Sequence, residues 1–569
     1  MTYGELDRAS NVLARRLLRI GISQGSYISL FFDKSRWYPV CIFACSKIGA
    51  PFFSIPPDVP PSRVQSIISQ LKDTKGRRSR VALSSIRQGE RAASFAPIVI
   101  QVDEEAVSED DGSVHSNIDL EFPRVKPTDN VYVVFTSGTT GNPKAIPITH
   151  SGICSFIAAW IGLRGHPGGL GVRHSQILSY AFDMSYVETL VCLGTGSCLC
   201  IPSEEERLND LCGALARYRV THLHATPSLS DIVDPENLPV LRHIHFSGEW
   251  MTHSLANRWL PRIDVQLTYG TAEITNECSG ARVSLEPGFS TANGCIGRPF
   301  GARMYITNPA NPHLRLPRGF VGEILVEGPG VTKGYVANQE QTARAFVQDL
   351  EWAPPFNGRA RRFYRTGDLG YQADDGLFFC RGRSDHQIKI RGHRIELSDV
   401  ESNIRALMPQ ATRIVADAIL LRGGTKALVA FLQFDATLSS KEQRTLINSL
   451  KEKLVEKLPL AFIPSSFVVV DHIPLGRTGK ADRRTLRNSI VADSMSELLS
   501  IKTLTITTRS ANETKRSNFL NVEPVAESLL DRALPAMHSE ILRGLWAAAL
   551  HVGAAEILPT SNFFALGGD

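Results

Sequence analysis

The hydrophobic pattern of the chain opens with an amphipathic helix. Apolar residues recur at helical spacing from Leu6 to Leu17, and Gly21 marks the end of that helix. An apolar run at residues 27–32 then predicts a strand, and residues 40–48 predict a second helix. Because strands and helices alternate in this way, we expect a parallel sheet with helices on its faces.

The alternation continues, with irregular loops, to about residue 380. Within it, residues 72–91 are polar and basic and predict an exposed loop. The regular alternation of strands and helices ends after Asp385. Short apolar runs and amphipathic segments then predict a small α+β domain over residues 386–487. In that domain we expect strands at 418–421, 427–434 and 466–470, and helices near 398–407 and 441–457.

The last part of the chain has a different composition. Residues from about 488 to 530 are rich in Ser, Thr and Asn and indicate a linker. An amphipathic helix returns beyond Pro535, and residues 562–569 form a hydrophobic and glycine-rich turn without a closing helix, as expected of a cut domain. The predicted domains are 1–384, 385–487, a linker at 488–535 and the start of a further domain at 536–569.

Composition narrows the class of protein. The chain has 569 residues, more than the roughly 250–300 that one hydrophobic core serves, so several domains are expected. Its 43% hydrophobic and 21% charged residues are ordinary for a globular enzyme. A net charge of +5 without a basic, aromatic stripe argues against nucleic acid, and ten cysteines without a C-x-x-C pair argue against a disulfide framework or a zinc site. No long apolar run or signal peptide is evident, which predicts a cytoplasmic protein with no membrane partner.

The most informative segment is 135–144, Phe-Thr-Ser-Gly-Thr-Thr-Gly-Asn-Pro-Lys. A predicted strand runs into a loop that is dense in hydroxyl groups and glycine and that ends in lysine. Glycine lets backbone N–H groups approach an anion, hydroxyl groups add donors and lysine adds charge, so the segment suits a polyphosphate. It is not a P-loop, because that motif needs Gly-Lys-Ser/Thr after four spacer residues.

This segment resembles the phosphate-binding loop of the ANL superfamily, which comprises acyl-CoA synthetases, luciferases and adenylation domains of nonribosomal peptide synthetases. Further segments resemble motifs of that family in the same order. They are 182–185 (Phe-Asp-Met-Ser) for the substrate pocket, 269–273 (Tyr-Gly-Thr-Ala-Glu) for adenine and magnesium, 364–368 (Tyr-Arg-Thr-Gly-Asp) for the ribose, 382–397 for the hinge and the segment after it, and 474–480 (Pro-Leu-Gly-Arg-Thr-Gly-Lys) for the terminal lysine loop. The resemblance implies an α/β fold with a large N-terminal domain of mixed sheets and helices and a small, mobile α+β C-terminal domain.

The resemblance also implies an ATP-dependent ligase that activates a carboxylate as an acyl-AMP. Glu273 would hold Mg²⁺, a hard cation that prefers oxygen ligands. Asp368 would accept hydrogen bonds from the ribose hydroxyls, Tyr269 would pack on adenine, and Arg383 would contact the nucleotide. The implied ATP-binding set is Thr136, Ser137, Gly138, Thr139, Thr140, Gly141, Lys144, Gly248, Tyr269, Gly270, Thr271, Asp368 and Arg383.

Two lysines of the small domain would act in turn. By resemblance, Lys480 reaches into the site and bridges carboxylate, phosphate and ribose oxygens, a role that suits a flexible point charge. Asp385 would be the hinge about which the small domain rotates between adenylation and thiolation. Lys389 would then serve the second half-reaction.

One position departs from the family pattern. Family members usually carry Thr where this chain has Ala272, so one hydroxyl group for the phosphate is missing. Neighbouring Thr271 is a candidate to replace it. The departure also leaves open a non-catalytic scaffold, against which the intact Lys480, Asp368 and Glu273 argue.

The destination of the acyl group divides the family. Segment 391–397 is similar to the form found in nonribosomal peptide synthetases, and segment 562–569 resembles the carrier-protein motif before its phosphopantetheine serine. That serine would be residue 570, so we expect a truncated carrier start without its attachment site, and an N-terminal strand pair also missing. The resemblance implies a carrier (thiolation) domain as partner and phosphopantetheine on that downstream domain.

Asp183 is the main clue to the substrate. In the adenylation domains that resemble this chain, an aspartate here pairs with the α-ammonium of an amino acid. Glu277 would place a second carboxylate in the pocket, and a cationic side chain on the substrate would be its partner unless Glu277 pairs with His224 or His245. The two His-x-His pairs are explained by alternation on strands. The implied pocket comprises Asp183, Met184, Val187, His224, His245, Ser247, Thr268, Asn276 and Glu277.

The favoured function is therefore activation of an amino acid for loading onto a carrier protein in nonribosomal peptide synthesis. The alternative is the adenylation domain of a carboxylic acid reductase or an acyl-CoA ligase that uses another acid.

Overall fold

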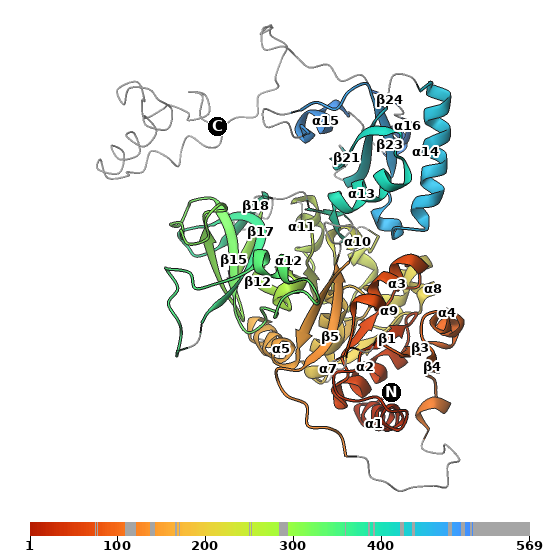
Figure 1. Ribbon diagram of the computed structural model, residues 1–569. Coiled ribbons are helices and arrows are strands. Elements are labelled where there is room, and N and C mark those ends of the chain that lie inside the picture. The colour runs from red at the N-terminus through yellow and green to blue at the C-terminus, as the bar shows by residue number, and fades with distance from the viewer. Residues whose placement is uncertain are drawn as a thin grey trace, which may run out of the picture. The chain divides into compact units, whose positions relative to one another are not determined.

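The structure is a computed structural model, drawn in Figure 1. It describes residues 1–73, 76, 78–108, 121–136, 143–164, 168–169, 171–230, 232–249, 251, 253–283, 294–358, 360–384, 387–390, 393–421, 426–434, 438–475, 481–490, 495–500 and 503–504. These residues belong to one compact unit, Met1–Ile506. Within these ranges no helix combines the length and the apolar character that a membrane crossing needs.

The first sheet lies in the N-terminal part of the chain. Its strand order is β4 (Ile98–Gln101), β3 (Val81–Ser84), β1 (Ile28–Phe31), β2 (Phe52–Ser54), β5 (Asn130–Thr136) and β6 (Lys144–Thr149). Neighbours are parallel except β5 and β6, which are antiparallel. Its helices are α1 (Tyr3–Arg19), α2 (Trp37–Lys47), α3 (Pro61–Gln70), η1 (Ile86–Gln88), α4 (Gly89–Ala93) and η2 (Glu105–Val107).

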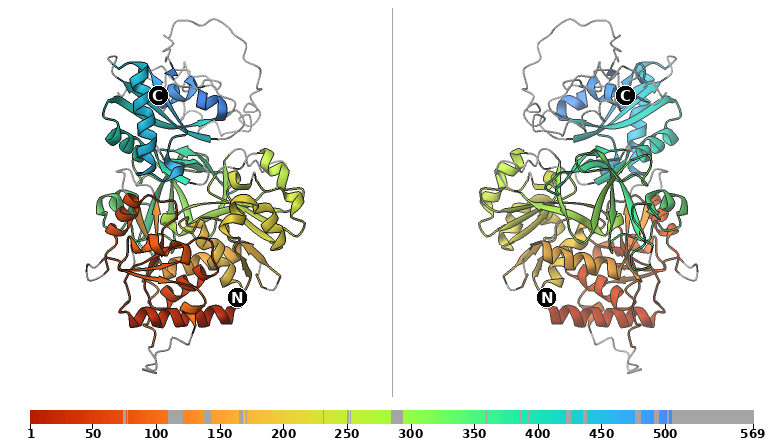
Figure 2. Two further views of the ribbon diagram at one scale, coloured as in Figure 1. Left: turned by 90° about the vertical axis from the view of Figure 1, so that its right-hand side faces the viewer. Right: turned by 90° about the vertical axis from the view of Figure 1, so that its left-hand side faces the viewer.

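The predicted first helix is confirmed, and its start has a clear cause. Thr2 and Glu5 form a capping box, in which each side chain accepts the other residue's backbone N–H. Leu13 and Leu17 are fully buried against α2 and the sheet. In Figure 2 this helix, in red, lies at the outer edge of the N-terminal layer.

The second sheet is larger and mixed. Its strand order is β14 (Arg303–Thr307), β15 (Gly322–Glu327), β17 (Arg362–Gln372), β18 (Phe378–Arg383), β13 (Cys295–Pro299), β12 (Asn276–Arg282), β11 (Asp264–Thr271), β10 (His243–Phe246), β9 (His222–Ala225), β7 (Arg173–Ser175) and β8 (Cys198–Cys200), with β16 (Phe346–Gln348) beside β17. The run from β8 to β11 is parallel and the rest is antiparallel. Its helices are α5 (His150–Arg164), α6 (Met184–Tyr186), the π-helix η3 (Val187–Val191), α7 (Cys192–Gly194), α8 (Glu204–Asn209), α9 (Leu211–Arg217), α10 (Pro227–Ser230), η4 (Pro235–Asn237), α11 (His253–Trp259), η5 (Ala272–Ile274) and α12 (Gln339–Ala345).

The C-terminal region has hydrophobic cores of its own. The predicted helices are confirmed as α13 (Leu397–Leu407) and α14 (Ser440–Val455), and the strands predicted at 427–434 and 466–470 as β22 (Lys426–Phe434) and β23 (Ser466–Val470). The strand predicted at 418–421 overlaps only the end of β21 (Ala411–Leu420), which begins seven residues earlier. The α/β fold with a small α+β C-terminal part is thus confirmed. The remaining elements are β19 (Gln387–Ile390), β20 (His393–Glu396), η7 (Leu460–Phe462), α15 (Arg483–Ser489), α16 (Met495–Ser500) and β24 (Thr503–Leu504).

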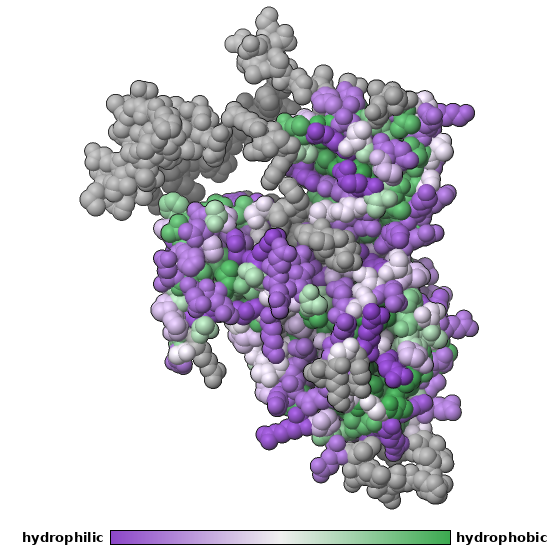
Figure 3. Space-filling view, in the orientation of Figure 1, coloured by the Kyte–Doolittle hydropathy of each residue, from purple (hydrophilic) through white to green (hydrophobic). Residues whose placement is uncertain are grey.

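The expectation of an exposed loop at residues 72–91 is wrong. Strand β3 and the start of α4 lie within this stretch, and Val81, Ala82 and Leu83 are buried. The strand is four residues long and flanked by arginines and serines, so the polar flanks hide its apolar character. On the face shown in Figure 3, hydrophilic side chains predominate and apolar ones are dispersed among them, as expected for a globular enzyme of this composition.

Candidate active site

A cavity of about 760 Å³ opens beside the carboxyl ends of parallel strands of the second sheet. In open α/β sheets this is the edge at which ligands bind. Ser247 follows β10, Asn276 and Glu277 begin β12, and Asp183 precedes α6. Five residues of the predicted substrate pocket line the cavity together: Asp183, Met184, Ser247, Asn276 and Glu277.

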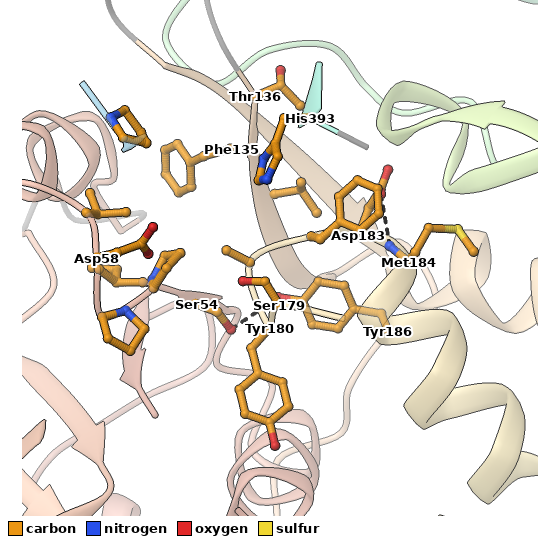
Figure 4. A pocket seen from close by; sticks show the side chains of 18 of the residues that line it. Ser54, Asp58, Phe135, Thr136, Ser179, Tyr180, Asp183, Met184, Tyr186 and His393 are labelled. Carbon is orange, nitrogen blue, oxygen red and sulfur yellow. Dashed lines mark hydrogen bonds between the residues drawn. The ribbon is translucent and has the colours of Figure 1, made fainter. Parts of the chain in front are cut away.

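Asp183 caps the short helix α6. Its Oδ1 accepts the Met184 backbone N–H at 2.9 Å, as Figure 4 shows. Burial raises the pKa of this carboxyl to about 6, although nearby Lys389 and the Met184 N–H act in the opposite direction. The carboxylate is therefore charged at neutral pH but poorly compensated, which suits a cationic group of a ligand.

Glu277 has internal partners. Its Oε1 lies 2.9 Å from His245 Nε2 and accepts a hydrogen bond from the Thr268 hydroxyl, while its Oε2 has no partner among the described residues. His245 is fully buried, with ring centroids 4.4 Å from Trp160 and 4.9 Å from His224. The pairing with His245, left open by the sequence, is thus present.

Four predicted pocket residues do not line this cavity: Val187, His224, His245 and Thr268. The histidines lie on neighbouring parallel strands in register, His222 beside His243 and His224 beside His245. Alternation on strands therefore accounts for both His-x-His pairs. Thr268 lines a second, adjacent cavity.

A strained turn directs Asn276 and Glu277 into the cavity. Thr275 has φ +57° and Asn276 φ +78°, in the left-handed region that a β-branched residue rarely adopts. The Thr275 hydroxyl donates to Gly330 O at 2.7 Å and holds the turn. Nearby, the backbone of Gly270 lies so close to Asn276 that a Cβ at Gly270 would come within 1.8 Å of Asn276 O.

The second cavity, of about 380 Å³, contains the residues predicted to bind the nucleoside. The Tyr269 hydroxyl donates to Asp368 Oδ2 at 2.5 Å, and Arg383 Nη1 donates to Asp368 Oδ1 at 2.6 Å. Asp368 and Arg383 are cross-strand partners on β17 and β18, which explains their proximity. Burial raises the pKa of Tyr269, and the Asp368 charge raises it further. Gly248, with φ +82°, also lines this cavity.

Glu273 is fully buried on η5 and bonded to two side chains. Arg394 Nη1 lies 3.0 Å from its Oε2, and the Tyr335 hydroxyl donates to its Oε1 at 3.0 Å. Burial alone would raise the pKa of this carboxyl, but Arg394, a backbone hydrogen bond, Lys144 and the Tyr335 hydroxyl together outweigh burial and hold the pKa at about 2. The charge of Glu273 is thus balanced by Arg394, whose role the sequence did not suggest.

Two further ion pairs join the same part of the C-terminal region to strand β6 and helix α3. Lys144 Nζ donates to Glu396 Oε1 at 2.9 Å, and Arg63 Nη1 lies 3.5 Å from Asp399 Oδ2. All four side chains are largely buried, Asp399 completely. Arg394 and Glu396 lie two residues apart on the short strand β20, so they share one face of it, and this spacing was the available sequence signal.

Lys389 lines both cavities. Burial lowers its pKa, while Asp368 and, less strongly, Asp183 oppose the change. Thr136 and Lys144 are cross-strand partners on either side of the loop predicted to bind phosphate. The predicted loop residues Ser137, Gly138, Thr139, Thr140 and Gly141, the predicted hinge residue Asp385 and Lys480 lie outside the described residues.

Thr271 and Ala272 both line the larger cavity. Ala272 is buried at the start of η5, and the Thr271 hydroxyl is buried without a hydrogen-bond partner among the described residues. An unpartnered buried hydroxyl is costly unless a ligand uses it. The residues Gly270, Thr271 and Ala272 thus line the larger cavity and directly follow Thr268 and Tyr269, which line the second.

The model of the AMP-binding enzyme family matches residues 1–336, more than half of the chain. The chain belongs to the AMP-binding enzyme family. This AMP-binding enzyme is 34% identical over 584 residues to "Nonribosomal peptide synthetase ungA" of Aspergillus violaceofuscus and 32% identical over 585 residues to "Peramine synthetase ppzA" of Metarhizium majus. Both alignments cover 100% of the chain, which spans only 6% and 20% of those relatives.

Solved structures share the fold of this AMP-binding enzyme. The Vibrio cholerae adenylation domain AlmE, in complex with glycyl-adenosine-5'-phosphate, has a TM-score of 0.70 at 21% identity, covering 86% of this chain and 92% of that one. Holo-PA1221, a nonribosomal peptide synthetase protein with adenylation and carrier domains, has a TM-score of 0.68 at 24% identity, covering 88% and 83%.

Proposed function

We propose that this AMP-binding enzyme activates an α-amino acid with ATP as an aminoacyl-AMP, releases pyrophosphate, and passes the aminoacyl group to the phosphopantetheine of a carrier domain in nonribosomal peptide synthesis. The observation that carries the proposal is the placement of Asp183. Its partly buried carboxylate lies in a cavity that shares Lys389 and Gly248 with the cavity of Tyr269, Asp368 and Arg383. The printed names of the relatives agree with it.

Adenylation requires a carboxylate to attack the α-phosphate of ATP, so negative charge gathers between two anions. The protein's task is to position both and to stabilise that charge. Asp183 would hold the α-ammonium of the substrate, which fixes the direction of its carboxylate. Tyr269 and Asp368 would hold adenosine, and Thr136, Lys144 and the loop between them would receive the phosphates.

Glu273 is the residue that would hold Mg²⁺. Its carboxylate is ionised, buried and already balanced by a cation, Arg394, so its environment tolerates a positive charge at this point. Carboxylate and phosphate oxygens suit this ion, which would offset phosphate charge when bound. The Thr271 hydroxyl, buried and without a described partner, would contact the same phosphates in place of the missing threonine at Ala272.

The arrangement of the C-terminal region fits the second half-reaction better than the first. Lys389 lines both cavities. Arg394 forms an ion pair with Glu273, the group needed for Mg²⁺, and Glu396 forms one with Lys144, the group needed for phosphate. Loading of ATP would break these ion pairs, and rotation about Asp385 would bring Lys480 to the site. Release of pyrophosphate would let the ion pairs form again.

Glu277 would select the side chain of the amino acid. His245 and Thr268 fix its Oε1, and Oε2 remains for a donor on the substrate. A basic side chain, or one with a strong hydrogen-bond donor, matches this wall. Because His245 already pairs with Glu277, a neutral polar side chain satisfies the site as well.

A pyrophosphate-exchange screen tests the proposal. Wild-type enzyme is assayed with ATP, Mg²⁺, labelled pyrophosphate and a panel of α-amino acids, each paired with its analogue lacking the α-amino group. We expect exchange with one or a few polar or basic amino acids and little with their analogues. Exchange with the analogues or aryl acids alone would instead favour a carboxylic acid reductase or acyl-CoA ligase acting on another acid.

A further inference from the structure

A buried polar cluster lies directly behind the segment that carries Asp183. It consists of Lys34, which follows β1, Gln176, which follows β7, and Glu188 on the π-helix η3. Gln176 and Glu188 are fully buried, and Lys34 lines the larger cavity. None of the three belongs to the motifs that predicted the active site.

Glu188 binds the first part of the loop that leads to Asp183. Its Oε1 accepts the Ile177 backbone N–H at 3.1 Å, and its Oε2 accepts the Leu178 N–H at 3.1 Å and Gln176 Nε2 at 2.9 Å. Glu188 itself comes five residues after Asp183 in the chain. One carboxylate therefore ties the start of the loop to the helix that begins where the loop ends.

Lys34 binds the same loop from the first sheet. Its Nζ donates to Gln176 Oε1 at 2.7 Å and to Leu178 O. It also lies 4.2 Å from the ring centroid of Tyr180, on which Tyr38 stacks with ring centroids 3.6 Å apart. Tyr180 is thus held between a cation and an aromatic ring. Figure 4 shows Tyr180 and Ser179 on the segment that ends at Asp183.

The cluster places two ionisable side chains where burial disfavours their charged forms. Burial lowers the pKa of Lys34 to about 7 and raises that of Glu188 to about 8. Replacement of buried ionic groups by apolar residues of similar volume is often neutral or stabilising. The hydrogen bonds of the cluster indicate a different role. Lys34 and Glu188 both bind the loop, which contains no regular secondary structure of its own, and so hold it in place.

The π-helical turn that carries Glu188 also supports a functional role for the cluster. Residues Val187–Val191 form a single π-helical turn between two short α-helical turns. Such turns are rare and occur frequently at functional sites. Glu188, at the second position of this turn, points its carboxylate back over the loop rather than along the helix, as its bonds to Ile177 and Leu178 require.

We propose that Lys34, Gln176 and Glu188 are positioning residues that fix the Asp183 carboxylate for recognition of the substrate α-ammonium. The proposal rests on the proposed function, since it assigns the cluster to amino-acid selection. The cluster touches the loop and not the reacting atoms. Its effect should therefore appear as loss of selectivity for the α-amino group and not as loss of nucleotide binding.

The test compares Glu188→Gln with wild type in pyrophosphate exchange. The measured quantity is the ratio of kcat/KM for the preferred amino acid to that for its analogue without the α-amino group. This ratio does not depend on the fraction of folded enzyme, so a merely structural defect leaves it unchanged. We expect it to fall about tenfold or more, as for a weakened charge-assisted contact, with the KM for ATP unchanged.

Glu327→Gln is the matched control. Glu327 is a partly buried carboxylate that binds Arg361 and Tyr305 on the second sheet, away from both cavities. Its replacement should leave the ratio at the wild-type value. If Glu188→Gln fails to fold, Lys34→Met tests the same idea from the other side and should lower the ratio by a smaller factor.

Two results are decisive. A wild-type enzyme that selects α-amino acids, with an unchanged ratio in Glu188→Gln or, where that variant does not fold, in Lys34→Met, would overturn the positioning role and leave the proposed function standing. A wild-type enzyme without such selectivity would instead contradict the proposed function. If both variants fold, their double mutant should lose less than the product of the two single effects, because the residues share one loop.

Discussion

The ionisation of Asp183 should control how tightly the enzyme binds its amino acid. Burial raises the pKa of this carboxyl from an ordinary 3.8 to about 6. Keeping it ionised in the empty cavity therefore costs about 3 kcal/mol, at about 1.4 kcal/mol for each pKa unit. A substrate ammonium removes much of this cost by pairing with the carboxylate, so binding requires the deprotonated form.

The sign of the pH dependence follows. Above about pH 7 Asp183 is ionised, and kcat/KM for the amino acid should be constant. Below about pH 6 the carboxyl is increasingly protonated and cannot pair, so kcat/KM should fall about tenfold for each further unit. The assay is pyrophosphate exchange between pH 5 and 8 with saturating ATP, and the KM for ATP measured in parallel should not follow this curve.

Asp183→Asn keeps the size and removes the charge. It should lower kcat/KM for the amino acid by about 10- to 100-fold, as expected for a charge-assisted hydrogen bond of about 1.5–3 kcal/mol, and remove the change near pH 6. Persistence of that change in the variant would assign it to another group, such as Asp399, whose pKa burial also raises to about 6. A change near pH 4 in wild type would equally refute the reasoning.

Three further substitutions test the remaining parts of the site. Glu277→Gln should weaken the recognition of basic amino acids by roughly 1–3 kcal/mol in the exchange panel and leave that of neutral ones unchanged. An equal loss for both would remove Glu277 from side-chain selection. Lys480→Ala should lower exchange by about 10²-fold or more with ATP binding retained, as equilibrium dialysis would show; unchanged exchange by folded protein would exclude it from the mechanism. Glu396→Gln frees Lys144 and should lower the KM for ATP by up to about tenfold; a higher KM would contradict the proposed competition.

The long periodic elements were predictable from local pattern alone. The helix that buries Leu13 and Leu17 and the helices and strands of the C-terminal region have enough regular spacing to be read directly. Strand β3 was not, because four buried residues between basic and polar neighbours give too short a signal. The site residues were predicted from motifs in a fixed order along the chain. A resemblance of this kind assigns a role to a residue without any knowledge of which residues contact it in the fold.

The contacts between site residues could not be predicted in this way. Glu277 was identified as a pocket carboxylate, but its distance to His245 depends on the register of β10, β11 and β12. Arg394 pairs with Glu273 only because a C-terminal hairpin lies against the large sheet. Lys34 and Glu188 are 154 positions apart in the chain, so only the fold brings them to the same loop.

Direct loading of a carrier protein tests the central claim most sharply. The enzyme is incubated with ATP, Mg²⁺, the amino acid selected in the exchange screen and a phosphopantetheine-bearing carrier domain, and intact-mass spectrometry follows the carrier. The account predicts a mass increase equal to the amino acid less water, one AMP released for each thioester, and no product with free coenzyme A. A coenzyme A thioester with an unmodified carrier, or loading of the matching acid without its α-amino group, would contradict it.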